Sequence, residues 1–205
     1  MNYKQIVFDI DGTLIDTEYA VLHSLQDTIR CIAGKNVDIE ELTFALGITG
    51  EDALHRLRIN DVVSALSLWD KKMCKYNHTV CIFDGIREML DILSHSGYEL
   101  GIVTSKTREE LVHDFSVFDI DFYFKTSVCA DDTAEHKPNP EPLLKYMELT
   151  KCNNQEILYI GDSKYDMECA KKAGINFALA GWGAKKKIDT ALWLETPMNV
   201  IKKFT

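Results

Sequence analysis

The segment that most constrains this chain lies at residues 6–16, where an apolar run leads into acids. Ile6, Val7 and Phe8 are followed by Asp9 and Asp11, and a glycine then interrupts the pattern. A short apolar run bounded by a turn residue is typical of a buried strand. The two acids therefore stand at the carboxyl end of a strand, where open α/β sheets place their active sites. Because two neighbouring like charges are unfavourable unless they share a cation or a proton, we expect something to bind there.

The second half of the chain alternates between strand and helix patterns. From residue 82 onward, apolar periodicity predicts helices over 86–95, 108–118, 141–149, 165–173 and 197–204, and strands over 98–104, 122–128, 156–160 and 175–180. Strands that alternate with helices predict a parallel sheet that is covered on both faces. We therefore expect an α/β protein with a Rossmann-like, three-layer core.

Residues 19–78 show helical patterns only. One apolar stripe runs through Leu22, Leu25, Ile29 and Ile32, and a second runs from 62 to 76 with Trp69 in its core-facing part. Short helices are expected over 40–46 and 51–58, and Asp61 is a candidate N-cap of the helix that follows it.

A connection of roughly 60 residues between two strands is far longer than usual. It predicts a helical cap domain of residues 17–81, inserted into a catalytic core of residues 1–16 and 82–205. The two crossings between core and insert, near 16–18 and 80–84, are candidate hinges for opening and closing.

Polar residues that can carry chemistry cluster where predicted strands end. The four clusters are 9–13, 104–106, 136–140 and 161–166. Because the carboxyl ends of parallel strands lie on one edge of a sheet, we expect these clusters to converge. They include four carboxylates, the two hydroxyls of Thr104 and Ser105, and the lysine at position 137. Carboxylate oxygens suit Mg²⁺, whereas hydroxyls, backbone N–H groups and a lysine suit a phosphate group.

Taken in order, the four clusters resemble those of the haloacid dehalogenase superfamily of phosphatases. The resemblance is to the branch with a helical cap after the first motif, which includes phosphoglycolate phosphatase and β-phosphoglucomutase. It covers essentially the whole chain, and it rests on the opening motif 9–14 together with the three later clusters.

This resemblance implies a catalytic role for the first two acids. Asp9 is the expected nucleophile, which forms an aspartyl-phosphate, and Asp11 is the expected general acid and base. The expected phosphate-binding residues are Thr104, Ser105, Lys137 and Gly12.

The resemblance also implies a Mg²⁺ cofactor. Asp9, the backbone carbonyl of Asp11, and Asp162 are the expected ligands. Asp166 is expected to bind the metal or to orient a water coordinated to it. The expected activity is hydrolysis of a small phosphorylated metabolite, with phosphoglycolate as one candidate.

Two other functions stay open at this point. A β-phosphoglucomutase usually has an arginine on its cap where this chain has Gly50, although Arg56 or Arg58 is a possible substitute. The second alternative is a catalytically silent binding module on the same fold.

Several other residues in or next to the four clusters are assigned ordinary structural positions. Lys106 and Arg108 are expected on an exposed helix face, and Asp131 and Asp132 in a solvated loop. His136 is expected to be a structural neighbour of the lysine that follows it.

Charge and composition limit the possible partners. The formal net charge is −9, which argues against a nucleic acid or an anionic membrane surface as partner. The first residues lack the pattern of a signal peptide, and the six cysteines form no CxxC pair. We expect a cytoplasmic protein that is a monomer or a weak homodimer.

Overall fold

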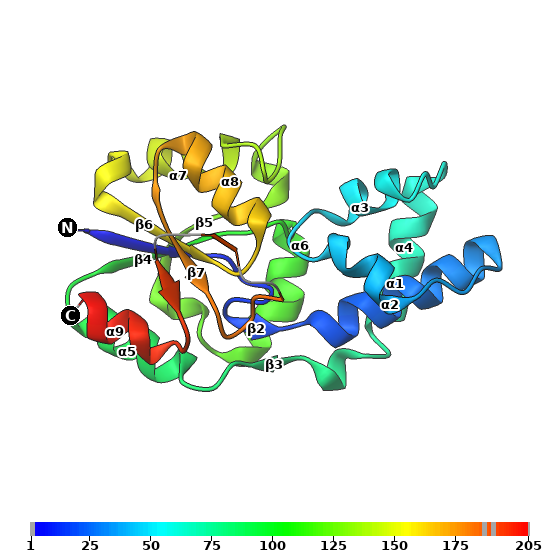
Figure 1. Cartoon of the computed structure of the whole chain (residues 1–205), viewed down its shortest axis with the longest axis horizontal. Helices are drawn as coiled ribbons and strands as arrows, with labels where there is room; N and C mark the ends of the chain where they lie inside the picture. The colour runs from blue at the N-terminus through cyan, green and yellow to red at the C-terminus, as the bar shows by residue number, and fades with distance from the viewer. Residues whose placement is uncertain (1–2, 186–187, 190–191, 205) are drawn as a thin grey trace.

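The computed structural model describes residues 3–185, 188–189 and 192–204, and its centre is a six-stranded sheet (Figure 1). The strand order is β5-β4-β1-β6-β7-β8, and all neighbouring pairs are parallel. The strands are β1 (Gln5–Phe8), β4 (Glu99–Val103), β5 (Phe124–Val128), β6 (Ile157–Gly161), β7 (Asn176–Ala180) and β8 (Trp193–Leu194). The predicted parallel α/β fold is confirmed.

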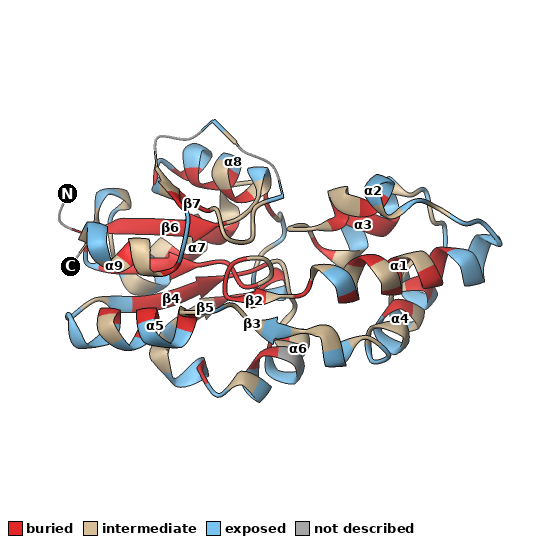
Figure 2. Ribbon diagram, turned by 60° about the horizontal axis from the view of Figure 1, so that its bottom comes forward, coloured by how far each residue is buried: buried red, intermediate tan, exposed pale blue. Residues whose placement is uncertain are grey.

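Helices cover both faces of the sheet, as Figures 1 and 2 show. One face carries α5 (Ile86–His95) and α9 (Met198–Phe204), and the other carries α7 (Glu141–Thr150) and α8 (Lys164–Ala173). The side chains of β1 alternate between these layers, with Ile6 and Phe8 in one apolar cluster and Val7 in the other. This two-sided burial explains why the strand reads as an unbroken apolar run.

The helical insert has an apolar core of its own. It contains α1 (Glu18–Ala33), α2 (Ile39–Leu42), α3 (Gly50–Arg56) and α4 (Val62–Met73), with 3₁₀ turns at Thr43–Ala45 and Asn77–Thr79. As predicted, Asp61 caps α4 by accepting a hydrogen bond from the Ser64 N–H at 3.1 Å. Trp69 is buried, and its Nε1 donates to Ser24 Oγ at 2.8 Å.

Some predicted elements differ from the observed ones. Ile32 is 44% exposed, because it lies in the last turn of α1 beyond the point where the other cap helices cover this helix. The helix predicted over 40–46 is divided into α2 and a 3₁₀ turn. The helix predicted over 108–118 consists of α6 (Arg108–Glu110), a π-helical turn (Leu111–Phe115) and a 3₁₀ turn (Ser116–Phe118).

The two crossings between core and insert pair with each other. The strands β2 (Ile15–Asp16) and β3 (Cys81–Ile82) form a short antiparallel ladder, which brings the entry and the exit of the insert together. We propose that the cap comprises residues 17–81 and that its movement is hinged at this pair. Within the described part of the chain, no helix combines the length and apolarity required to span a membrane.

Candidate active site

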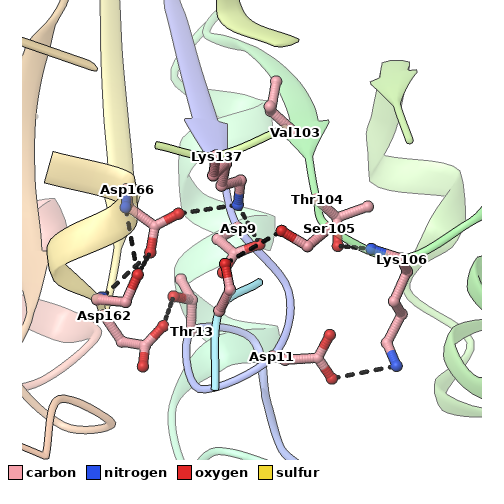
Figure 3. Close-up of polar contacts among 12 residues, drawn as sticks. Asp9, Asp11, Thr13, Val103, Thr104, Ser105, Lys106, Lys137, Asp162 and Asp166 are labelled. Carbon is pink, nitrogen blue, oxygen red and sulfur yellow. Dashed lines mark hydrogen bonds and ion pairs between the residues drawn. The ribbon is translucent and has the colours of Figure 1, made fainter. Parts of the chain in front are cut away.

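Three loops at the carboxyl edge of the sheet carry the first, second and fourth sequence clusters. Asp9 follows β1, Thr104 follows β4, and Asp162 follows β6. Because β1 lies between β4 and β6 in the sheet, the last two residues flank Asp9. The loop between β5 and α7 adds Lys137 from above this edge (Figure 3).

Lys137 is the centre of a buried charge cluster. Its Nζ lies 2.8 Å from Asp9 Oδ1 and 2.8 Å from Asp166 Oδ1, and all three side chains are almost completely buried. Burial by itself would lower the pKa of the ammonium group. The charges of Asp166 and Asp9 outweigh that effect and raise the pKa, so Lys137 is a cation at neutral pH.

The acids around this lysine outnumber it. One carboxylate oxygen from each of Asp9, Asp162 and Asp166 lies within 4.8 Å of the other two. Burial raises the pKa of Asp9 to about 7, even though Lys137 lowers it, and burial also raises the pKa of Asp162. One ammonium does not balance three carboxylates in a buried position. The donor set is all oxygen, which fits a hard divalent cation.

The remaining hydrogen bonds fix Asp166 more tightly than the other acids. Its Oδ1 accepts from Lys137 and from the Tyr159 hydroxyl, at 2.8 and 2.9 Å. Its Oδ2 accepts from the N–H and the hydroxyl of Ser163, at 3.1 and 2.5 Å. Ser163 is also the N-cap of α8, so the start of this helix and the orientation of the carboxylate depend on each other.

Gly12 allows the first loop to approach the acid of the fourth cluster. Its φ is +76°, and a Cβ at this position would lie 2.4 Å from Asp162 Oδ2. Thr13 Oγ1 adds a long hydrogen bond of 3.4 Å to Asp162 Oδ1. A larger residue at position 12 would therefore displace Asp162 from its place beside Asp9.

The carboxylate of Asp11 points away from the cluster of acids (Figure 3). Its Oδ1 accepts a hydrogen bond of 2.8 Å from the Thr17 hydroxyl and lies 3.2 Å from Lys106 Nζ. The prediction that Lys106 lies on an exposed helix face is therefore wrong, because its side chain is only 11% exposed. The helix begins at Arg108, and Thr107 and Glu110 form its capping box, so Lys106 lies before the helix in the strand-end loop. This capping pattern is the sequence signal that would have located it.

The other residues of these loops lie near their expected positions. Asp131 and Asp132 are exposed, but both accept hydrogen bonds from Arg108. The backbone N–H of Arg108 donates to Asp131 at 2.9 Å, and its guanidinium group donates to Asp132 at 2.6 Å. Arg108 therefore anchors the loop after β5 rather than facing only solvent. His136 Nε2 lies 3.1 Å from the carbonyl oxygen of Ala130.

A cleft of about 870 Å³ separates the charge cluster from the cap. Core residues that line it include Asp9, Asp11, Lys106 and Asp162, and the cap adds residues 45–51 together with Trp69 and Lys71. Among the described residues that line the cleft there is no arginine.

Segment 44–52 of the cap contacts the core at the loop after β4 and at the start of α8. Ser105 Oγ donates to the carbonyl oxygen of Gly47 at 3.1 Å, and Tyr165 OH donates to the carbonyl oxygen of Phe44 at 3.2 Å. Arg56 stacks on the Phe44 ring and donates to Tyr165 OH at 3.1 Å. The cap is therefore in contact with the edge of the sheet that bears the acids.

Comparison with known proteins agrees with this geometry. Residues 6–180 match the model of a family described as haloacid dehalogenase-like hydrolase. The chain belongs to this family. A candidate PpaX pyrophosphatase of Caldanaerobacter subterraneus is 32% identical over 183 residues, which cover 89% of this chain and 83% of the relative. The PpaX pyrophosphatase of Halalkalibacterium halodurans is 29% identical over 193 residues, which cover 90% of this chain and 86% of the relative.

A solved structure has the same architecture over almost the whole chain. A candidate phosphoglycolate phosphatase of Lactobacillus plantarum matches with a TM-score of 0.89 and 28% identity, over 98% of this chain and 99% of that one. The resemblance that the four sequence clusters indicated is therefore confirmed. This chain is a haloacid dehalogenase-like hydrolase, and its relatives are named pyrophosphatases and phosphatases.

Proposed function

We propose that this protein is a Mg²⁺-dependent phosphatase that hydrolyses the phosphomonoester of a small metabolite through an aspartyl-phosphate on Asp9. One observation carries the proposal. The carboxylate of Asp9 is held 2.8 Å from the Lys137 ammonium at the edge of a cleft, beside a second, half-buried acid, Asp162. A carboxylate that is fixed by a cation and open to a cleft on one side is suited to attack a phosphoryl group.

In this proposal the two acids of the first motif have different tasks. The free oxygen of Asp9 attacks phosphorus, and Lys137 neutralises charge on the nucleophile and on the phosphoryl oxygens. Asp11 stands on the cleft wall, held by Thr17 and Lys106. From there it gives a proton to the leaving alcohol and then takes one from the water that hydrolyses the phosphoenzyme.

Thr104 and Ser105 would complete the phosphoryl site. Thr104 is buried at the end of β4, and its Oγ1 accepts from the Lys106 N–H at 3.2 Å, which leaves its own proton for a phosphoryl oxygen. The Ser105 hydroxyl donates to the cap, so its backbone N–H is the donor that we assign to phosphate.

Mg²⁺ fits the acids of this site. Asp9, the backbone carbonyl of Asp11, and Asp162 would hold it, and when bound it would neutralise charge that develops on the phosphoryl group. Asp166 already accepts four hydrogen bonds, so we assign it to the orientation of Lys137 rather than to a direct bond to the metal.

The names of the relatives and the lining of the cleft limit the range of candidate substrates. The names make inorganic pyrophosphate and phosphoglycolate the first compounds to test. The mutase alternative is weakened because neither Arg56 nor Arg58 lines the cleft. A cytoplasmic location and a monomer or weak homodimer remain predictions.

The test is turnover of p-nitrophenyl phosphate by the purified protein with Mg²⁺, followed by a panel of phosphorylated metabolites. We expect hydrolysis by the wild type and by Asp131→Asn, which changes an exposed aspartate of the same cleft. We expect none by Asp9→Asn. A wild type without phosphatase activity would favour the silent binding module, and formation of glucose 6-phosphate from β-glucose 1-phosphate would favour the mutase.

A further inference from the structure

A tyrosine lies directly beneath the charge cluster. Tyr159 is in the middle of β6, and its side chain is completely buried in the apolar layer under α7 and α8. Its hydroxyl lies 2.9 Å from Asp166 Oδ1 and 3.0 Å from the carbonyl oxygen of Val103. The hydroxyl has one proton, and the carboxylate is the stronger acceptor. The hydrogen bond to Asp166 is therefore the main one.

The orientation of the Asp166 carboxylate, which Tyr159 contacts, is fixed by hydrogen bonds to both of its oxygens. Asp166 accepts from Lys137 and Tyr159 on one oxygen, and from the N–H and hydroxyl of Ser163 on the other. An ionised carboxylate offers about four acceptor sites, and these four donors use them. The position of Asp166 thus results from the start of α8 on one side and from β6 on the other.

Lys137 depends on that carboxylate for its own position. A lysine ammonium is a point charge on a flexible four-carbon stem, so its partners decide where it stands. Its ammonium donates hydrogen bonds to Asp9 and Asp166, and its Nζ lies 5.5 Å from the centre of the Tyr159 ring. If Asp166 turns, the ammonium follows it and leaves the oxygen of the nucleophile.

We propose that Tyr159 is a positioning residue for the reaction, which holds Lys137 against Asp9 through Asp166. The inference deepens the function proposed above and rests on it. Phosphoryl transfer depends mainly on positioning and on charge stabilisation, and small displacements of the groups involved have large effects on rate. Sequence patterns did not indicate this role, because an aromatic residue in a buried strand has packing as its ordinary function.

The chain contains a matched control for this inference. Tyr146 is also buried in the same apolar layer, and its hydroxyl donates to Gln5 Oε1 at 2.6 Å. Gln5 begins β1, at the end of the strand opposite to Asp9. Tyr146→Phe therefore removes a buried, hydrogen-bonded hydroxyl of the same kind that has no connection with the charge cluster.

The first experiment measures hydrolysis of p-nitrophenyl phosphate with Mg²⁺, well below the melting temperature of each variant. For Tyr159→Phe we expect kcat to fall about tenfold with KM changed by less than about twofold, whereas Tyr146→Phe keeps kcat within about twofold. In an Asp166→Asn background, Tyr159→Phe is expected to change kcat by less than about twofold, because its path to Lys137 is already broken. An unchanged kcat in Tyr159→Phe, or an equal loss in Tyr146→Phe, would overturn the inference. So would a full tenfold loss in the Asp166→Asn background.

The second experiment needs no turnover. The buried ammonium of Lys137 should give a resolved ¹H–¹⁵N resonance, which is assigned by its loss in Lys137→Met. We expect this resonance to shift or broaden in Tyr159→Phe and to stay in place in Tyr146→Phe. An unmoved resonance in Tyr159→Phe would overturn the inference. An inactive wild type would refute the proposed function alone, since the resonance still reports whether Tyr159 positions Lys137.

Discussion

The Ser105 hydroxyl, in the loop after β4, donates a hydrogen bond of 3.1 Å to the carbonyl oxygen of Gly47 in the cap. Gly47 also lies against the fourth sequence cluster, where a Cβ would come 2.8 Å from Ser163 Oγ. One glycine therefore contacts the loops of two different strands at once. Its φ of +85° is a conformation that other residues rarely adopt.

We expect Gly47→Ala to impair closure of the cap, because the added methyl group collides with Ser163. The expected loss in kcat/KM is about tenfold or more. Gly34→Ala is the control. It introduces a side chain at a φ of +64°, at the end of α1, with no atom within 4 Å of the new Cβ. Equal kcat/KM for the two variants would show that contact between Gly47 and the core does not matter.

The pair formed by Lys106 and Asp11 is expected to support proton transfer. Lys106→Met removes the cation 3.2 Å from Asp11 Oδ1 and leaves the carboxylate with Thr17 as its remaining side-chain partner. We expect kcat to fall by about tenfold, as is common when a catalytic group loses its orientation. Lys125→Met, which breaks an exposed pair with Glu99, should leave kcat unchanged. Full activity in Lys106→Met would mean that this pair has no catalytic role.

Asp27 is expected to stabilise the cap in a pH-dependent manner. It accepts hydrogen bonds from Lys75 Nζ at 3.0 Å and from Tyr76 OH at 2.9 Å, which tie α1 to the segment after α4. Burial raises the pKa of this carboxyl group, but the hydrogen bonds from Lys75 and Tyr76 lower it by a larger amount. The net result is a pKa below the usual value. An acid whose pKa is lowered by folding contributes stability above its unfolded pKa of about 3.9, and the contribution is lost as pH falls through the folded pKa.

We therefore expect Asp27→Asn to reduce the free energy of unfolding by about 1 kcal/mol at pH 7, a modest value because Lys75 is largely exposed. The difference from the wild type should shrink as pH falls below about 3.9. Urea unfolding followed by circular dichroism measures both effects. Asp121→Asn, which changes an exposed aspartate of the catalytic core domain, is the control. A difference that stays constant down to low pH would contradict the assignment.

Strand ends were predictable because apolar runs stop where polar loops begin. The positions of Asp9, Thr104 and Asp162 follow from that rule together with the parallel sheet. The contact between Lys106 and Asp11 was not predictable in the same way, because it joins side chains from the loops that follow two different strands. The two-residue strand β8 was also missed, since two residues show no periodicity.

Contacts between the cap and the core could not be predicted from the sequence, for a different reason. Arg56 was considered as a substitute for the cap arginine of a β-phosphoglucomutase, but it stacks on Phe44 and donates a hydrogen bond to Tyr165. Residues 44 and 165 are distant in the chain, and their approach results from how two separately packed units meet. Periodicity within either unit contains no information on that arrangement.

Metal binding is expected to stabilise the folded protein. A ligand that binds only the folded state adds about 2.7 kcal/mol at a concentration of 100 times its Kd, so Mg²⁺ should raise the melting temperature of the wild type. Asp162→Asn should abolish this rise. Without Mg²⁺ it should melt at the same temperature or higher, because it removes a carboxylate whose pKa is raised by desolvation beside two other acids. An equal rise in both proteins would place the metal elsewhere.

The central claim is that Asp9 becomes phosphorylated during turnover. Its most direct test is mass spectrometry of the protein after acid quenching during hydrolysis of p-nitrophenyl phosphate with Mg²⁺. We expect the mass of one phosphoryl group on the peptide that contains Asp9 in the wild type, and none in Asp9→Asn. Phosphate on another residue, or steady turnover by Asp9→Asn, would contradict the account.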